Sequence, residues 1–288
     1  MKGIILAGGT GSRLWPITKS VSKQLLPVYD KPMIYYPIAT LMLAGITEIL
    51  LITTPHDKKS FEDLLGNGSG FGVNIQYAIQ PKPEGLAQAF IIGENFLDQD
   101  SCVMILGDNI FHGAGLGNEL SNSLPTSGAH IFTYEVANPS EYGVLEIDDR
   151  NLPISVTEKP KEFISNLAVT GLYFFDSKVS ALAKAVKPSE RGELEITSLI
   201  DAYLRDGNLT YTKLSRGTAW LDTGNPDSLH DAASYIRIIE DRTGLKIACL
   251  EEIAWHKGWI DRKVLENQIQ INIKNSYGKY LKRLLLES

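Results

Sequence analysis

Apolar residues along the chain fall into two alternating patterns. Continuous apolar runs of about five residues are typical of buried strands, whereas apolar residues three or four positions apart are typical of helices that cover a sheet. The predicted strands are residues 3–7, 48–53, 74–79, 102–106, 130–136 and 168–175, and the predicted helices are 34–44, 86–97, 178–186 and 195–206. This order predicts an α/β fold with a mainly parallel sheet flanked by helices.

Two regions depart from this alternation. Residues 143–160 contain shorter, hairpin-like segments, which predict that the sheet is mixed. From about residue 226 the pattern is helical to the end of the chain. Because no repeat or Pro/Gly-rich linker separates these parts, we interpret residues 1–288 as a single domain, with 1–225 as the α/β core and 226–288 as a helical C-terminal extension.

Composition and charge narrow the class of protein. The chain has 43% hydrophobic and 22% charged residues, as in ordinary globular proteins, and a formal net charge of −6, which argues against nucleic-acid binding. No apolar run approaches the roughly 20 residues of a membrane span, and the run at the N-terminus is too short for a signal peptide. Cys102 and Cys249 have no ligand-like spacing and indicate buried thiols in a reducing compartment. These features predict a cytoplasmic protein.

A glycine-rich segment follows the first predicted strand and is the first candidate site. Gly8, Gly9 and Gly11 allow backbone N–H groups to approach a phosphate closely. Arg13, next in the same loop, can hold two phosphate oxygens with its guanidinium group. The spacing matches neither the Walker A motif nor the dinucleotide fingerprint, and a plain tight turn is the alternative interpretation.

Lys23 provides a second candidate cation. It lies in a segment of poor helical periodicity, which indicates an ordered loop near the glycine-rich one. A lysine there can supply a point charge to a triphosphate, whereas a solvated surface lysine is the alternative. Together, Lys23 and Arg13 form a plausible clamp for an anion.

Two acidic residues are candidates for a metal site. Asp108 ends an apolar strand at the edge of the sheet where α/β folds bind their ligands, and Asp222 also precedes a glycine by two positions. Mg²⁺ commonly binds one or two carboxylates together with substrate phosphates. The two acids could therefore share one Mg²⁺, although an Asx turn or a helix cap explains Asp108 equally well.

Glu158 and Lys159 are candidates for binding a phosphorylated sugar. They follow a strand-like run, where a carboxylate can bind sugar hydroxyls and an ammonium group can bind a phosphate. An exposed ion pair beside a proline is the alternative for this dipeptide.

In a series of blocks along nearly its whole length, the chain resembles the glucose-1-phosphate thymidylyltransferases, which are sugar nucleotidyltransferases. The first blocks are LAGGTGSRLWP and SKQLLPVYDKPMIYYP, and the later ones, in order, are YAIQPKPEGLAQAF, LGDN, EYGVLE, VTEKPK, VTGLYFFD, RGELEIT, AWLDTG and IKNSYGKYLKRLL. The first block alone indicates only the superfamily, whereas the joint occurrence of all blocks is specific.

The resemblance implies a Rossmann-like core with an inserted substrate-binding sheet and C-terminal helices, and it implies roles for individual residues. The catalytic residues would be Arg13 and Lys23. The nucleotide would contact Gly8, Gly9, Gly11, Ser12, Arg13, Lys23, Gln24, Gln80, Gly85 and Asp108. The sugar phosphate would contact Asn109, Tyr142, Gly143, Glu158, Lys159 and Val169, and Mg²⁺ would be held by Asp108 and Asp222.

The chain departs from the family pattern at a few positions. Ser12 stands where the family commonly has threonine, and it keeps the hydroxyl group. Ser198 stands where an aspartate often follows the GELEIT block, and residues 111–118 match the family only loosely. We assign no catalytic role to Ser198.

The reaction implied by the resemblance joins dTTP and glucose 1-phosphate to give dTDP-glucose and pyrophosphate, as the first step towards dTDP-rhamnose and other deoxysugars. It needs no general base, because a phosphate monoester is already anionic. This agrees with the histidines, which show no catalytic or metal-binding spacing: His56, His112, His130, His230 and His256. Charge compensation and alignment should therefore dominate catalysis.

Two alternatives remain at this stage. The nearer is the same reaction with UTP or CTP, because one glutamine at residue 80 does not separate thymine from uracil. The other is a nucleotide-sugar-binding regulator without turnover, which would be expected to lack Arg13, Lys23 or a metal-binding carboxylate. The resemblance also implies a homotetramer with feedback inhibition by dTDP-rhamnose.

Overall fold

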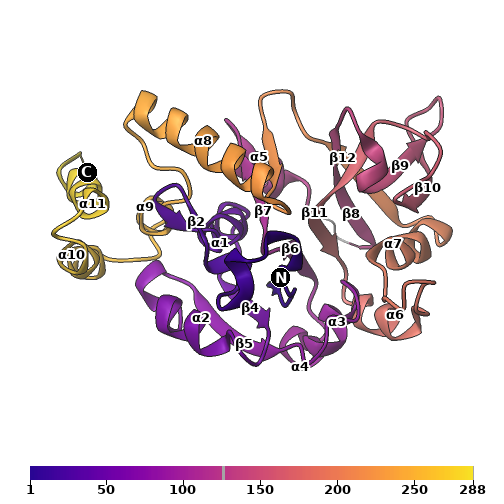
Figure 1. The fold of residues 1–288 in the computed structure, drawn as a ribbon, viewed down its shortest axis with the longest axis horizontal. Coiled ribbons are helices and arrows are strands. Elements are labelled where there is room, and N and C mark those ends of the chain that lie inside the picture. The colour runs from indigo at the N-terminus through magenta and orange to yellow at the C-terminus, as the bar shows by residue number, and fades with distance from the viewer. Residues whose placement is uncertain (125–126, 288) are drawn as a thin grey trace.

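The computed structural model describes residues 1–124 and 127–287, in which a nine-stranded sheet is surrounded by helices (Figure 1). The strands of this sheet are β1 (Lys2–Ala7), β4 (Glu48–Thr53), β5 (Asn74–Ile79), β6 (Cys102–Leu106), β8 (Ala129–Glu135), β9 (Gly143–Ile147), β10 (Pro153–Glu158), β11 (Leu167–Phe175) and β12 (Leu209–Lys213). Two short pairs lie apart from it, namely β2 (Pro27–Val28) with β3 (Lys31–Pro32) and β7 (Asn109–His112) with β13 (Ala219–Asp222).

The sheet has a parallel half and a mostly antiparallel half, in which only β12 pairs parallel, with β8. Strands β5, β4, β1 and β6 are neighbours and run parallel. On the other side of β6, strand β11 runs antiparallel to β6, β8 and β9, and β9 forms an antiparallel hairpin with β10. The prediction of a mixed, mainly parallel sheet with a hairpin in residues 143–160 is therefore confirmed.

Helices are found in every region where they were predicted, and two further helices, at residues 58–65 and 116–122, were not predicted. The helices are α1 (Tyr35–Leu43), α2 (Lys58–Leu65), α3 (Gln88–Ile92), α4 (Glu94–Leu97), α5 (Leu116–Asn122), α6 (Val179–Ala185), α7 (Ile196–Arg205), α8 (Pro226–Thr243), α9 (Leu250–His256), α10 (Arg262–Ile271) and α11 (Ser276–Glu287). Short 3-10 helices are η1 (Ser12–Leu14), η2 (Ile17–Lys19), η3 (Lys23–Leu25), η4 (Ser69–Phe71) and η5 (Pro139–Glu141). Within the described ranges, no helix combines the length and the apolar character that crossing a membrane requires.

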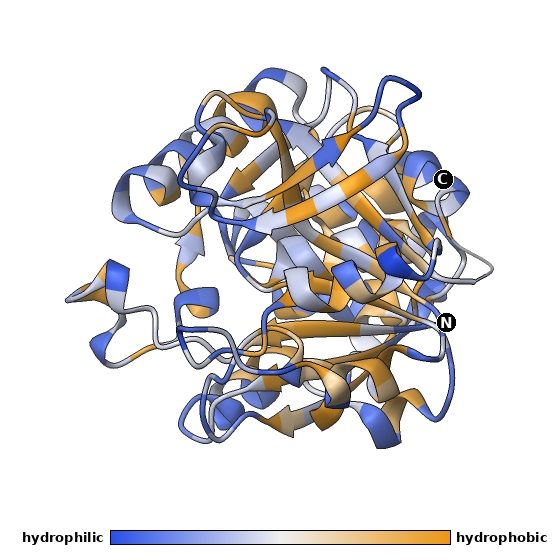
Figure 2. Cartoon of the chain, turned by 90° about the vertical axis from the view of Figure 1, so that its right-hand side faces the viewer, coloured by the Kyte–Doolittle hydropathy of each residue, from blue (hydrophilic) through white to orange (hydrophobic). Residues whose placement is uncertain are grey.

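Helices cover both faces of the parallel half, which explains its continuous apolar runs. In β1, Ile5 points into a cluster with Ile38 of α1, whereas its neighbour Ile4 points into a second cluster with Phe90 of α3. Successive side chains of a strand alternate between its faces, so a strand that is buried on both faces needs apolar residues at nearly every position. Figure 2 shows these central strands coloured as hydrophobic, with hydrophilic loops around them.

The helical extension predicted from residue 226 is confirmed, and it shares the core of the α/β part. Leu250 of α9 and Leu281 of α11 are fully buried in the same cluster as Ile5. Helices α10 and α11 lie at one end of the molecule, opposite β9 and β10 (Figure 1). The two helices approach closely at Gly278, where a Cβ would lie 2.0 Å from the backbone oxygen of Asn272.

Some elements differ from the prediction. The single helix predicted for residues 86–97 is divided at Gly93 into α3 and α4. The glycines at positions 113, 115 and 117 suggest a surface loop from sequence alone, but this segment contains the start of α5 at Leu116. The short strands β7, β12 and β13 were not predicted, because four or five residues carry too little periodicity to be recognised.

Candidate active site

A cavity of about 410 Å³ is lined by residues at the ends of β1 and β6, at the start of β9, at the end of β10 and within β11. It contains most of the residues that the sequence predicted for the site. The predicted residues that line it are Gly8, Gly9, Arg13, Gln24, Gln80, Gly85, Asp108, Asn109, Tyr142, Gly143, Glu158, Lys159, Val169 and Asp222. Gly11, Ser12 and Lys23 lie outside the lining, and only Lys23 bonds directly to a lining side chain.

The glycine-rich loop leads from β1 into the short helix η1. A Cβ at Gly8 would lie 2.0 Å from Gln80 Oε1, so only glycine allows this approach. Gly11 adopts a left-handed φ of 61°, and its carbonyl accepts a 2.7 Å hydrogen bond from Thr18 Oγ1. This turn brings Arg13, in η1, to the cavity.

Lys23 and Asp108 form an ion pair beneath the cavity. Lys23 Nζ lies 2.6 Å from Asp108 Oδ2, and the lysine side chain is 7% exposed. The other carboxylate oxygen of Asp108 accepts a 3.0 Å hydrogen bond from Asn109 Nδ2. Burial acts to raise the pKa of Asp108, but Lys23 and this hydrogen bond outweigh it and hold the pKa below its usual value. Lys23 is therefore a buried, paired cation and not the surface lysine of the alternative interpretation.

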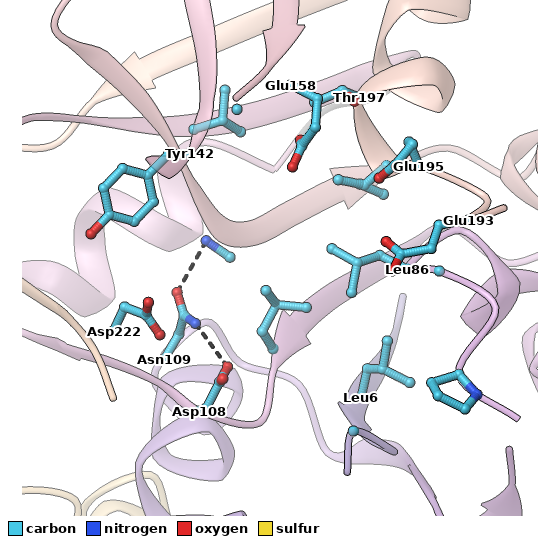
Figure 3. Close-up of a pocket in the computed structure, with 18 of the residues that line it drawn as sticks. Leu6, Leu86, Asp108, Asn109, Tyr142, Glu158, Glu193, Glu195, Thr197 and Asp222 are labelled. Carbon is cyan, nitrogen blue, oxygen red and sulfur yellow. Dashed lines mark hydrogen bonds between the residues drawn. The ribbon is translucent and has the colours of Figure 1, made fainter. Parts of the chain in front are cut away.

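Asp222 lies beside Asp108 because β13 pairs with β7. In this register Asp222 is opposite Asn109, and the next residue, Thr223, donates from Oγ1 to the Asp108 carbonyl at 2.8 Å. Burial raises the pKa of Asp222, and repulsion from Asp108 raises it further. Figure 3 shows both carboxylates on the same side of the cavity, next to Asn109. The structure thus brings together the two acids that the sequence could only propose as a pair.

The two carboxylates fit the demands of Mg²⁺. They are hard oxygen donors held side by side, and their mutual repulsion, which adds to burial in raising the pKa of Asp222, is of the kind that a divalent cation relieves. Among the described residues, no group of three or more His, Cys, Asp or Glu side chains could hold a metal. A two-carboxylate site completed by phosphate oxygens is consistent with both findings.

Asn109 has a structural task in addition to its predicted contact with the sugar phosphate. Its Oδ1 accepts a 2.6 Å hydrogen bond from Trp220 Nε1 and a 3.2 Å bond from the Gly171 N–H. Its Nδ2 donates to Asp108. The carbonyl end is thus already used, and any ligand contact would have to come from the remaining N–H.

Of the predicted sugar-phosphate residues, Asn109 lies beside Asp108, whereas Gly143 and Glu158 belong to the β9–β10 hairpin and Lys159 follows it. Gly143 begins β9 and Glu158 ends β10, so the hairpin pairs them directly. The Lys159 N–H donates to the Tyr142 carbonyl at 2.9 Å, which holds the residue after Glu158 against the hairpin. Burial raises the pKa of Glu158, and the nearby Glu195 raises it further. In Figure 3 the Glu158 carboxyl points into the cavity.

Sequence reasoning missed several charged and polar residues of this wall. Arg191 forms an ion pair of 2.9 Å with Glu195 and longer contacts of 3.4 Å with Glu193 and 3.6 Å with Glu158. Arg191, Glu193 and Glu195 belong to the RGELEIT block, for which the sequence predicted no site role. The further lining residues without a prediction are Leu6, Pro83, Leu86, Leu106, Glu141, Gly171, Tyr173, Ile196, Thr197 and Trp220.

The cavity and fold can be compared with known proteins. The sequence pattern of the nucleotidyl transferase family matches residues 2–237. The chain is 55% identical to the glucose-1-phosphate thymidylyltransferase of Neisseria meningitidis serogroup A over 286 residues, which cover 99% of each chain. It is also 55% identical to the enzyme of that name from Mycobacterium tuberculosis over 285 residues, again 99% of each chain.

Solved structures support the same relationship. A Bacillus anthracis protein assigned as a glucose-1-phosphate thymidylyltransferase, solved with sucrose, matches with a TM-score of 0.76 and 45% identity over 82% of this chain and 95% of that one. A UDP-glucose pyrophosphorylase solved with UDP-glucose shares the fold, with a TM-score of 0.74 and 24% identity over 83% and 98% of the two chains. The chain is a nucleotidyltransferase and belongs to the glucose-1-phosphate thymidylyltransferases.

Proposed function

We propose that this enzyme transfers a thymidylyl group from dTTP to α-D-glucose 1-phosphate in a Mg²⁺-dependent reaction, giving dTDP-glucose and pyrophosphate. One observation carries the proposal. A single cavity is lined by glycines of the first loop, Arg13 and the two acids Asp108 and Asp222, and also by Glu158 and Lys159. The names of the relatives, which share 55% of their residues with this chain over nearly the whole length, support the same pair of substrates.

The reaction is a direct in-line displacement. A phosphate oxygen of the sugar phosphate forms a bond to the α-phosphorus of dTTP, while the bond from that phosphorus to the bridging oxygen of the β-phosphate breaks. The electron pair of the broken bond leaves with pyrophosphate. No proton has to be removed from the nucleophile, because a phosphate monoester is anionic near neutral pH. The barrier therefore comes mainly from repulsion between two polyanions and from their alignment.

The residues of this chain act on that barrier through charge and position. Arg13 would hold phosphate oxygens of dTTP from the glycine-rich loop, and Lys23 would exchange part of its contact with Asp108 for a contact with the triphosphate. Asp108 and Asp222 would hold Mg²⁺, which supplies charge compensation at the phosphate oxygens. The ammonium group of Lys159 would bind the sugar phosphate, and Glu158 would bind sugar hydroxyls.

The other expectations from the resemblance belong to the same proposal. We infer a cytoplasmic homotetramer whose activity is inhibited by dTDP-rhamnose. UTP or CTP in place of dTTP is the nearest alternative. A non-catalytic regulator is disfavoured, because Arg13, Lys23 and both acids are present in one cavity or directly beneath it.

The test is pyrophosphate release measured with a panel of nucleoside triphosphates and sugar 1-phosphates. We expect the highest kcat/KM with dTTP and glucose 1-phosphate. Lys23→Ala should lower turnover by roughly 10²–10³-fold, as the loss of one transition-state charge contact typically does. Lys59→Ala is the matched control, because Lys59 is an exposed lysine paired with Asp63 on α2. Near-normal turnover of the Lys23 variant at saturating substrate would remove this lysine from the mechanism.

The metal is tested separately. Asp222→Asn should raise the Mg²⁺ concentration needed for half-maximal activity, because one of two carboxylates is lost. The combined loss of both acids should cost less than the sum of the single losses, since they serve one site. An unchanged Mg²⁺ requirement in the single variant would exclude Asp222 as a ligand.

A further inference from the structure

A chain of three polar side chains runs from the cavity to the surface. Gln80 lines the cavity and is 3% exposed, and its Nε2 donates a 2.7 Å hydrogen bond to Gln88 Oε1. Gln88 Nε2 in turn donates a 2.7 Å bond to Glu84 Oε2, and Glu84 is exposed. Gln88 and Glu84 do not line the cavity, so the site described above gives them no task.

The direction of this relay is fixed by the groups at its outer end. A carboxylate can only accept hydrogen bonds, so Glu84 requires the NH₂ end of Gln88. The backbone N–H of Glu84 can only donate, and it lies 3.3 Å from Gln88 Oε1. Both groups demand the same orientation of Gln88, with its carbonyl oxygen toward Gln80. Gln80 must then present its own NH₂ end to Gln88, which leaves its carbonyl oxygen turned the other way.

The outer end of the relay is itself held in place. The Glu84 carbonyl accepts a 2.7 Å hydrogen bond from the Leu194 N–H, and the Ala87 N–H donates to the Leu194 carbonyl at 3.0 Å. Between these bonds Gly85 has a φ of 106°, and a Cβ there would lie 2.4 Å from the Leu194 backbone. The turn that carries Glu84 is thus bonded on both sides of Gly85 to Leu194, whose neighbours Glu193 and Glu195 line the cavity.

The free end of Gln80 is an acceptor that faces the glycine loop. Its Oε1 is the atom that comes within 2.0 Å of the position of a Cβ at Gly8, and both residues line the cavity. An acceptor matches a base with a ring N–H donor, such as N3–H of thymine or uracil. Cytosine has a lone pair at N3, and a carbonyl oxygen opposite that lone pair leaves two acceptors unpaired.

We propose that Glu84 and Gln88 are positioning residues that lock the Gln80 amide with its carbonyl toward the base, and so set the specificity for thymine or uracil over cytosine. This inference rests on the proposed function, with Gln80, one of the nucleotide contacts that the resemblance implies, placed at the base. A Gln80 that could turn its amide by 180° would pair with cytosine as well, because its NH₂ group would then face N3. The relay does not separate thymine from uracil, since both carry N3–H.

The experiment measures kcat/KM for dTTP and dCTP, with glucose 1-phosphate, in the full-length enzyme. Glu84→Gln removes the carboxylate that can only accept hydrogen bonds, and Gln88→Leu removes the side chain that links Glu84 to Gln80. In each variant the ratio of kcat/KM for dTTP to that for dCTP should fall at least about fivefold. The expected size follows from a well-placed base-edge contact, which contributes about 5- to 150-fold. The double variant Glu84→Gln with Gln88→Glu should restore the ratio. Its carboxylate at position 88 again accepts from Gln80, and the amide at position 84 can donate to it.

Controls separate the relay from general effects. Glu94→Gln removes the same charge from an exposed glutamate that pairs with Lys184 and has no bond to the relay, so it should leave the ratio unchanged. Gln80→Ala should abolish most of the preference for dTTP over dCTP. Melting temperatures of all variants identify any that fail to fold, and the rescued double variant keeps the wild-type net charge.

The outcomes are distinguishable. If the wild type prefers dTTP but Glu84→Gln and Gln88→Leu keep its ratio within twofold, the relay does not orient Gln80 and the inference is wrong, while the proposed function stands. A double variant that does not regain selectivity also overturns the inference. A wild type that uses dTTP and dCTP equally contradicts it directly. A wild type that releases pyrophosphate from no pyrimidine triphosphate refutes the proposed function itself.

Discussion

Four charged residues, of which Lys31 and Glu240 are buried and Asp30 and Lys246 are partly accessible, form a network that joins β3 to the end of α8. Lys31 Nζ lies 2.9 Å from Glu240 Oε1 and is also paired with Asp30, and Lys246 Nζ lies 2.6 Å from Glu240 Oε2 and is likewise paired with Asp30. The side chains of Lys31 and Glu240 are only 2% and 3% exposed. We predict that Lys31→Met strongly destabilises the fold, although Met fills a similar volume.

The magnitude follows from the charge balance of the network. In the native protein two cations face two carboxylates, so the network is neutral. Lys31→Met leaves Lys246 between Asp30 and Glu240, with one buried negative charge uncompensated. Removing one partner of a buried pair costs about 3–5 kcal/mol, and the remaining cation places the expected loss near the lower end, at about 3 kcal/mol.

A double-mutant cycle makes the prediction sharper. Glu240→Gln alone leaves an excess positive charge and should also cost about 3 kcal/mol of stability. The double variant keeps the neutral Asp30–Lys246 pair and should cost only about 1 kcal/mol, because neutral replacement of a buried ion pair is often tolerated. The summed losses of stability in the two single variants should therefore be far larger than the loss in the double variant.

The assay is the free energy of unfolding from urea denaturation of each variant. The exposed pair Lys59–Asp63, 2.6 Å apart with side chains 77% and 62% exposed, supplies the control cycle. Lys59→Met should cost less than about 0.5 kcal/mol, as solvent screens such a pair. Additive single losses at Lys31 and Glu240, or a loss below about 1 kcal/mol for each, would refute the reasoning from buried charge.

Three further predictions concern pH and close packing. His130 is buried and hydrogen-bonded to Thr210 and Thr212, and burial lowers its pKa to about 4. As the pH falls below about 6.5, the unfolded state therefore takes up a proton on this histidine before the folded state does. Stability should thus drop by about 2 kcal/mol at pH 5, and urea denaturation of His130→Gln should lack this part of the loss. Gly85→Ala should lower the melting temperature more than Gly207→Ala does. Both glycines have a positive φ, but only at Gly85 would a Cβ meet described atoms within 4 Å. Equal decreases in melting temperature would contradict this prediction. Gly278→Ala should cost about 1–3 kcal/mol and speed hydrogen exchange in α10 and α11, since its Cβ would meet the Asn272 backbone; unchanged exchange would show that the contact is dispensable.

The sequence by itself determined the elements that depend on local pattern. The strands at residues 48–53 and 102–106 are found where they were predicted, because a run of apolar residues between polar breaks is itself the signal for a strand buried on both faces. The same holds for the glycine loop, whose residues are adjacent in sequence. Most of the candidate site was also found in this way, through the resemblance of short blocks.

Tertiary structure decided everything that depends on partners far apart in the chain. From the sequence, Lys23 could be either a triphosphate-binding cation or a solvated surface lysine, and only the fold shows that it is paired at 2.6 Å with Asp108, 85 residues away. Asp222 becomes a partner of Asp108 only because β13 pairs with β7. Strands as short as these have no periodicity of their own to recognise, so their pairing cannot be seen before the chain is folded.

The orientation of side chains lies furthest from the sequence. Gln80 was predicted at the base, but nothing in the sequence says which end of its amide faces a ligand. That choice depends on Gln88 and Glu84 and on the Leu194 backbone that holds their turn. A sequence specifies which groups can donate or accept a hydrogen bond, whereas only the folded arrangement specifies which of them meet, because distance and direction decide whether a hydrogen bond forms.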